Sequence, residues 1–148
     1  MSTRNRFVGL ALAVGLISGC SVLPNIGGIG NSDPYAITTN RDSYNRGNTG
    51  EATIRNISGE SLEYNLCPRR LERRTNRDWT TAYEWPTAGG VCTTDLRRIG
   101  RGEALNALFE IPVGIPTGTY RVVFTQLLGE GSRQLSADDA ATPSFEVR

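Results

Sequence analysis

The sequence predicts an all-β fold, a sandwich of two antiparallel sheets with about seven to eight strands. Several short segments alternate apolar and polar residues with a period of two, which is the pattern of a strand with one buried face. Turn-forming residues separate these segments at short intervals. The chain has 148 residues, of which 38% are hydrophobic, and this is enough for the core of one domain.

The strands are expected in the order in which the alternating segments occur. The clearest segments are residues 62–66, 105–111 and 120–125. Shorter candidates are residues 35–38, 52–55 and 144–147. Turn residues lie between them at 45–47, 58–59, 100–102, 116–118 and 129–131.

Residues 69–85 are open to two interpretations. The segment follows Pro68 and lacks both Pro and Gly. It places four residues at intervals of four, which would suit a helix that begins after a proline: Leu71, Thr75, Trp79 and Tyr83. However, its second half is rich in Trp, Thr and Tyr, which favour strands. Thr75-Asn76-Arg77-Asp78 has the composition of a turn. We therefore expect a β-hairpin here.

The first twenty residues have the pattern of an export signal. Two arginines, Arg4 and Arg6, precede an apolar run over residues 7–17, and Ser18 and Gly19 then lead to Cys20. The run is too short for a membrane-spanning helix, which needs about 20 apolar residues, but has the length of a secretory signal. The simplest alternative is an ordinary cleaved secretory signal that ends near a cysteine.

Leu16-Ile17-Ser18-Gly19-Cys20 resembles the lipobox of bacterial lipoproteins. The resemblance implies that residues 1–19 are removed and that Cys20 carries a diacylglycerol and an amino-terminal fatty acid such as palmitate. Two or more acyl chains anchor a protein stably. Ser21 in place of Asp favours the outer membrane of the bacterial cell envelope, on its periplasmic face or at the surface. Residues 20–33 are rich in Gly and turn formers and are expected to form a tether to a domain at 34–148.

Beyond Cys20, the sequence has two cysteines, Cys67 and Cys92. In an exported protein, two cysteines most simply form one disulfide, and no Cys-x-x-Cys spacing supports a redox couple or a metal pair. Alternation points Cys67 away from Leu62, Tyr64 and Leu66, so the bridge is expected at the sandwich edge. There it would tie the loop around residues 86–90 to a strand end.

The domain resembles bacterial Ig-like domains, including those of the BsuPI-like proteinase inhibitor type. The resemblance covers residues 35–148. It rests on Tyr44-Asn45-Arg46-Gly47 before a strand, Leu71-Glu72-Arg73-Arg74 leading to Trp79, residues 96–102, Gly118-Thr119-Tyr120-Arg121 and Ser144-Phe145-Glu146-Val147. It implies an Ig-like sandwich in which Gly118 and Tyr120 belong to a tyrosine corner. The alternative for Tyr120 is an inward-facing aromatic residue without a special hydrogen bond.

Two groups of residues are candidates for binding. The first is an arginine cluster that suits carboxylates or phosphates, formed by Arg69, Arg70, Arg73, Arg74 and Arg77. The second is aromatic and suits a sugar ring or a protein interface: Trp79, Tyr83 and Trp85, which are expected close together, with Tyr83 and Trp85 on one side of a strand. The alternatives are a charged edge strand that resists aggregation and ordinary core packing.

The composition argues against catalysis. The sequence has no histidine, no lysine, no Gly-x-Ser-x-Gly elbow and no phosphate-binding Gly-Lys-Ser/Thr motif. We therefore expect no enzyme, no cofactor and no metal site. The formal charge of +1 gives no reason to expect a nucleic-acid partner. The expected function is a non-catalytic, lipid-anchored module that binds or scaffolds an envelope protein or glycan. A periplasmic protease inhibitor is the alternative, and a small glycan-active enzyme is a second one.

Overall fold

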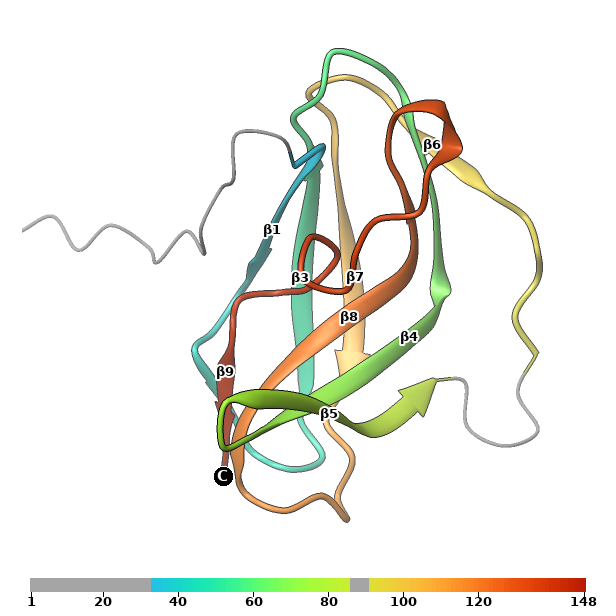
Figure 1. The fold of residues 1–148 in the computed structure, drawn as a ribbon. Coiled ribbons are helices and arrows are strands. Elements are labelled where there is room, and N and C mark those ends of the chain that lie inside the picture. The colour runs from blue at the N-terminus through green and yellow to red at the C-terminus, as the bar shows by residue number, and fades with distance from the viewer. Residues whose placement is uncertain (1–32, 86–90) are drawn as a thin grey trace, which may run out of the picture.

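The computed structural model describes residues 33–85 and 91–148, which form two packed β-sheets (Figure 1). The elements are β1 (Tyr35–Thr39), β2 (Ser43–Tyr44), β3 (Thr49–Asn56), β4 (Leu62–Thr75), β5 (Asp78–Trp85), β6 (Arg97–Ile99), β7 (Ala104–Glu110), β8 (Gly118–Leu128), the short 3₁₀ turn η1 (Glu130–Ser132) and β9 (Phe145–Val147). The predicted all-β sandwich is confirmed. Within the described residues, no helix has the length and apolar character needed to cross a bilayer.

The strand order is that of an immunoglobulin sandwich. The smaller sheet has the order β1-β3-β7, and the larger has the order β2-β9-β8-β4-β5, with β6 also paired to β4. Immunoglobulin sheets follow strands A, B, E and D on one side and G, F, C and C′ on the other. The described strands match these orders except at two places. β2 is an additional strand beside β9, and no described strand takes the place of D, because β6 pairs with β4.

The core forms where the alternating residues of the two sheets meet. In β7, Phe109 is buried and Leu108 is exposed, as the period of two predicts. The rings of Tyr44, Phe109 and Phe145 pack together with centroids 5.0 to 5.7 Å apart. The backbone of Gly50 lies against them so closely that a Cβ there would stand 2.4 Å from the Phe109 ring. A glycine is therefore required for this approach of β3 to β7.

The predicted disulfide is confirmed, but Cys67 lies at a different point of the strand. Cys67 and Cys92 are bonded, with their Cα atoms 5.6 Å apart. We expected Cys67 at a strand end, whereas it lies in the middle of β4. The strand continues past Pro68 because residues 66–68 bulge opposite Thr125 of β8 alone, so the missing N–H of proline is tolerated. Residues 86–90, which we expected the bridge to hold, lie outside the described residues.

The two ends of the sandwich have different roles. The chain enters at Pro34, whose carbonyl accepts a hydrogen bond from the Ile57 amide at 3.0 Å, so this end holds the β3–β4 connection. The opposite end holds the β4–β5 turn, the β7–β8 loop and the C-terminus (Figure 1). There the Arg148 carbonyl accepts a hydrogen bond from the Arg46 amide at 3.3 Å. Any group at this second end therefore lies far from the point where the chain joins the domain.

Candidate functional site

The segment 69–85 is a β-hairpin, as predicted. β4 ends at Thr75, β5 begins at Asp78, and these two residues pair directly. Asn76 makes the turn with φ of 59°, a left-handed conformation that Asn tolerates better than most residues. Among the described strands, β5 pairs only with β4 and is the edge strand of the larger sheet. All eight residues of the predicted arginine and aromatic groups lie on this hairpin.

Three of the five clustered arginines are used within the fold. Arg69 donates to the Leu66 carbonyl at 2.7 Å, and Arg73 donates to the Thr117 carbonyl at 3.1 Å. Arg70 pairs with Glu72, with 2.7 Å between Nε and Oε1.

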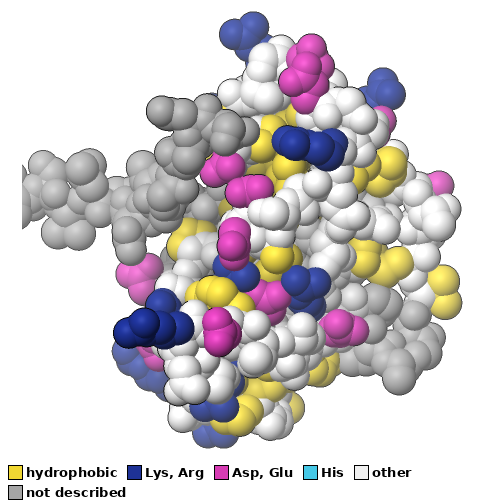
Figure 2. All heavy atoms as spheres, in the orientation of Figure 1, with side chains coloured by type: hydrophobic (Ala, Val, Ile, Leu, Met, Phe, Trp, Pro, Cys, Tyr) yellow, Lys and Arg dark blue, Asp and Glu magenta, His cyan; other side chains and the backbone are white. Residues whose placement is uncertain are grey.

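The other two, Arg74 and Arg77, are exposed, and neither forms an ion pair within the described residues. Arg74 stacks over the ring of Trp79 at 5.8 Å. Figure 2 shows arginine and acidic side chains interleaved across the middle of the face of the molecule that is in view. The geometry favours the charged-edge interpretation over a single anion-binding patch.

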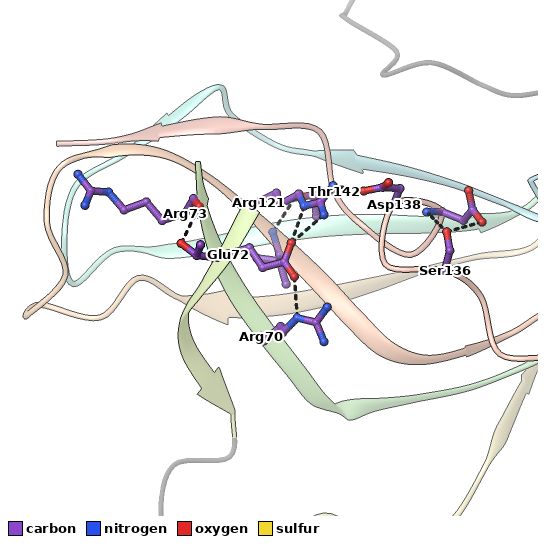
Figure 3. Close-up of polar contacts among 10 residues, drawn as sticks. Arg70, Glu72, Arg73, Arg121, Ser136, Asp138 and Thr142 are labelled. Atoms are coloured by element: carbon purple, nitrogen blue, oxygen red, sulfur yellow. Dashed lines mark hydrogen bonds and ion pairs between the residues drawn. The ribbon is translucent and has the colours of Figure 1, made fainter. Parts of the chain in front are cut away.

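A buried ion pair joins β4 to β8 on the outer face of the larger sheet. Glu72 and Arg121 are directly paired across the strands and are 5% and 8% exposed. One Glu72 oxygen accepts from Arg121 at 2.8 Å, and the other accepts from Arg70 (Figure 3). Arg121 also pairs with Asp138 at 2.7 Å. Both buried charges are thus compensated, as burial of charge requires.

The segment over residues 138–142 covers this ion pair. The Thr142 hydroxyl accepts from the Val122 amide at 3.0 Å, and the Thr142 amide donates to the Val122 carbonyl at 2.8 Å. These bonds hold the segment along the edge of β8 and place Asp138 beside Arg121 (Figure 3). The sequence interpretation missed this cluster. The signal for this cluster in the sequence is Val123. This residue is apolar although it points to the outer face of the sheet, which indicates that the outer face of β8 is covered.

A β-bulge divides the three aromatic residues of β5 between the two faces of the sheet. Leu71 pairs with Tyr83 but Glu72 pairs with Thr81, so Ala82 has no partner in β4. Trp79 therefore lies on the outer face, where Arg121 stacks over its ring at 4.5 Å. The expectation that all three aromatic residues lie close together was wrong, because one extra residue reverses the side on which the following side chains point.

Tyr83 and Trp85 share the inner face, as expected, and both pack against the core. Their rings meet edge to face, with centroids 5.1 Å apart. Arg69 stacks over Trp85 at 5.3 Å from the ring centroid, and burial lowers the pKa of this arginine from its ordinary value. The two rings are thus held in place by neighbours on both strands of the hairpin.

These rings form one wall of a groove of about 450 Å³. The other wall is the β7–β8 loop, with Pro112, Val113 and Ile115, and Glu110 is the charged residue in the lining. Val113 is 76% exposed at the mouth, whereas Ile115 is buried. We call this site the aromatic groove. The β7–β8 loop, which forms one wall of the groove, lies at the end of the sandwich away from the entry of the chain (Figure 1).

The β7–β8 loop is held by the predicted tyrosine-corner residues. The Tyr120 hydroxyl donates to the Pro116 carbonyl at 2.7 Å, four residues upstream, which is the geometry of a tyrosine corner. Gly118 has φ of 147°, and a Cβ there would crowd the Arg73 guanidinium. Burial raises the pKa of Tyr120. This corner fixes the loop wall of the aromatic groove.

The remaining predicted site residue, Cys20, lies outside the described residues. Among the described residues, no group of three or more cysteine or acidic side chains is arranged to hold a metal ion. No protein-family model matches the sequence, and no curated protein matches it.

Two solved structures are similar in part. Spo0M, a sporulation control protein from Bacillus subtilis, is 13% identical with a TM-score of 0.46, over 77% of this chain and 48% of that one. The alkylpurine DNA glycosylase AlkC of Pseudomonas fluorescens, bound to DNA containing an abasic site analog, is 11% identical with a TM-score of 0.38, over 76% of this chain and 29% of that one. The chain thus spans about half the length of the first and less than a third of the second.

Proposed function

We propose that the chain is a non-catalytic, lipid-anchored module of the bacterial cell envelope that binds a partner through the aromatic groove. The groove is the observation that carries this proposal. A concave, mostly apolar site of 300–1,000 Å³ with a few polar groups is the usual form of a binding site. Its walls are held by the bulged hairpin and the tyrosine corner, so the site exists before a partner arrives.

The position of the groove fits a tethered module. The lipobox-like residues 16–20 supply the proposed anchor, and the chain reaches the domain at Pro34. The β7–β8 loop, one wall of the groove, lies at the other end of the sandwich (Figure 1). A domain held at the first end leaves the second end free to meet a partner away from the membrane.

The anchor is tested by replacing its cysteine. Cys20→Ser should move the protein from the membrane fraction to the soluble fraction, and the mass of the mature protein should lose the acyl chains. Cys67→Ser is the matched control, because it removes a different cysteine and should leave the protein in the membrane fraction. A Cys20→Ser protein that stays in the membrane fraction would contradict the anchor.

The binding site is tested by crosslinking in intact cells. A photo-crosslinking amino acid at Val113, at the mouth of the groove, should give a discrete adduct with an envelope component. The same amino acid at Leu108 is the control, because Leu108 is also apolar and 60% exposed but lies on β7 outside the groove. Equal adducts at both positions, or none at Val113, would contradict a partner in the groove.

A further inference from the structure

The polar groups of the aromatic groove restrict what it binds. Among the described residues, the Tyr83 hydroxyl and the Trp85 indole N–H have no hydrogen-bond partner, and Glu110 forms no ion pair. The residues that line the groove thus include one with a hydroxyl, one with an N–H donor and one with a carboxylate, among otherwise apolar residues. Since Glu110 is the charged residue of the lining, its charge favours a cationic or neutral ligand over an anionic one.

The apolar walls restrict the ligand further. Aromatic rings form one side of the groove, and Pro112, Val113 and Ile115 form the other. A sugar ring carries hydroxyls around its edge, and each hydroxyl that the groove buries without a partner is costly. A proline ring has no polar group, so it fills the same space without this cost.

We propose that the aromatic groove binds an extended, proline-rich segment of a partner protein that carries an arginine or lysine beside the prolines. This inference rests on the proposed function and names its ligand. A polyproline II segment has exposed carbonyls and no internal hydrogen bonds. Its carbonyls accept from Tyr83 and Trp85, its proline rings lie between the walls, and its basic side chain pairs with Glu110. Aromatic-lined grooves recognise such segments in other folds.

Two substitutions separate these contacts with little risk to folding. Tyr83→Phe keeps the ring and removes one donor, so it should weaken binding about fivefold. Glu110→Gln keeps the shape and removes the charge, so it should weaken binding about tenfold for an arginine-bearing peptide and leave binding of a neutral peptide unchanged. Glu84→Gln is the matched control, because Glu84 is an exposed carboxylate on β5 outside the groove lining.

The experiment measures binding to the full chain in detergent micelles by fluorescence anisotropy. The probe is a labelled synthetic peptide of proline pairs and single alanines with arginine at both ends. A peptide with every proline replaced by glycine tests the polyproline conformation, and a neutral oligosaccharide serves as competitor. We expect saturable binding of the proline peptide and no binding of the glycine peptide. Tyr83→Phe and Glu110→Gln should weaken binding as given above, and Glu84→Gln should leave it unchanged.

Three results would refute the proposed ligand. They are equal binding of the glycine peptide, no effect of either groove substitution, and displacement of the probe by the oligosaccharide. The proposed function fails separately, when Val113 gives no specific crosslink in cells. A specific crosslink at Val113 without any binding of the proline peptide would retain the groove as a site and refute this ligand.

Discussion

Removal of the buried arginine on β8 should strongly destabilise the domain. Arg121→Met deletes the contacts to Glu72 at 2.8 Å and to Asp138 at 2.7 Å. Breaking a buried ion pair costs about 3–5 kcal/mol, because one charge stays buried. Since Arg70 still contacts Glu72 at 2.7 Å, we expect a loss near the lower end, about 3 kcal/mol of the free energy of unfolding.

Two companion variants test this reasoning. Asp138→Asn removes a carboxylate whose side chain is 83% exposed, so it should cost no more than about 0.5 kcal/mol. The double variant with Glu72→Leu and Arg121→Met replaces both charges by apolar groups, and it should be nearly as stable as the original protein. The double variant is thus expected to be more stable than Arg121→Met alone.

The measurement is urea unfolding at neutral pH, followed by far-ultraviolet circular dichroism so that the loss of the Trp79 contact does not affect the signal. Domains of this kind are stable by about 5–15 kcal/mol, so a change of about 3 kcal/mol shifts the midpoint clearly. The reasoning fails if Arg121→Met costs no more than Asp138→Asn, or if the effects of Glu72→Leu and Arg121→Met simply add.

Three further predictions concern the rest of the fold. Tyr120→Phe should lower the free energy of unfolding by about 1 kcal/mol, because the Pro116 carbonyl loses its donor; an unchanged urea midpoint would show that the corner contributes nothing. Reduction of Cys67–Cys92, which are 25 residues apart, should cost about 3 kcal/mol by the chain-entropy account, measured as a lower melting temperature in reductant. Burial raises the pKa of Tyr35 above its ordinary value of 10.0 and so favours its neutral form in the folded state. The contribution of Tyr35 to stability should therefore be constant below about pH 10 and fall above it, and Tyr35→Phe should make the loss of stability above this pH shallower in urea titrations.

The sequence predicted the local parts of this fold well. The period of two is a property of each strand, so β7 and the start of β8 were found from their own residues. The hairpin turn at residues 75–78 was likewise found from its composition. β2 was missed because a strand of two residues has no period, and it is defined only by its parallel pairing with β9.

The candidate site was predicted only in part. Tyr83 and Trp85 were correctly placed on one side of β5, but the opposite wall of the groove is far away in sequence and leaves no local pattern. The burial of Arg121 depends on the segment around Thr142, again a distant contact. The bulge at Ala82 also has no signature in sequence, because a small residue fits a regular strand equally well.

Ala82, which has no partner in β4, affects how such a groove can arise or be lost in evolution. In a strand without a bulge, Trp79, Tyr83 and Trp85 would all face the same side of the sheet. A substitution of one residue by another therefore cannot place Trp79 on the opposite side from Tyr83 and Trp85. The insertion or deletion of a single residue in β5 changes this arrangement in one step. Among relatives of this chain, the length of the fifth strand, more than the identity of its aromatic residues, should therefore distinguish those that keep the groove from those that lack it.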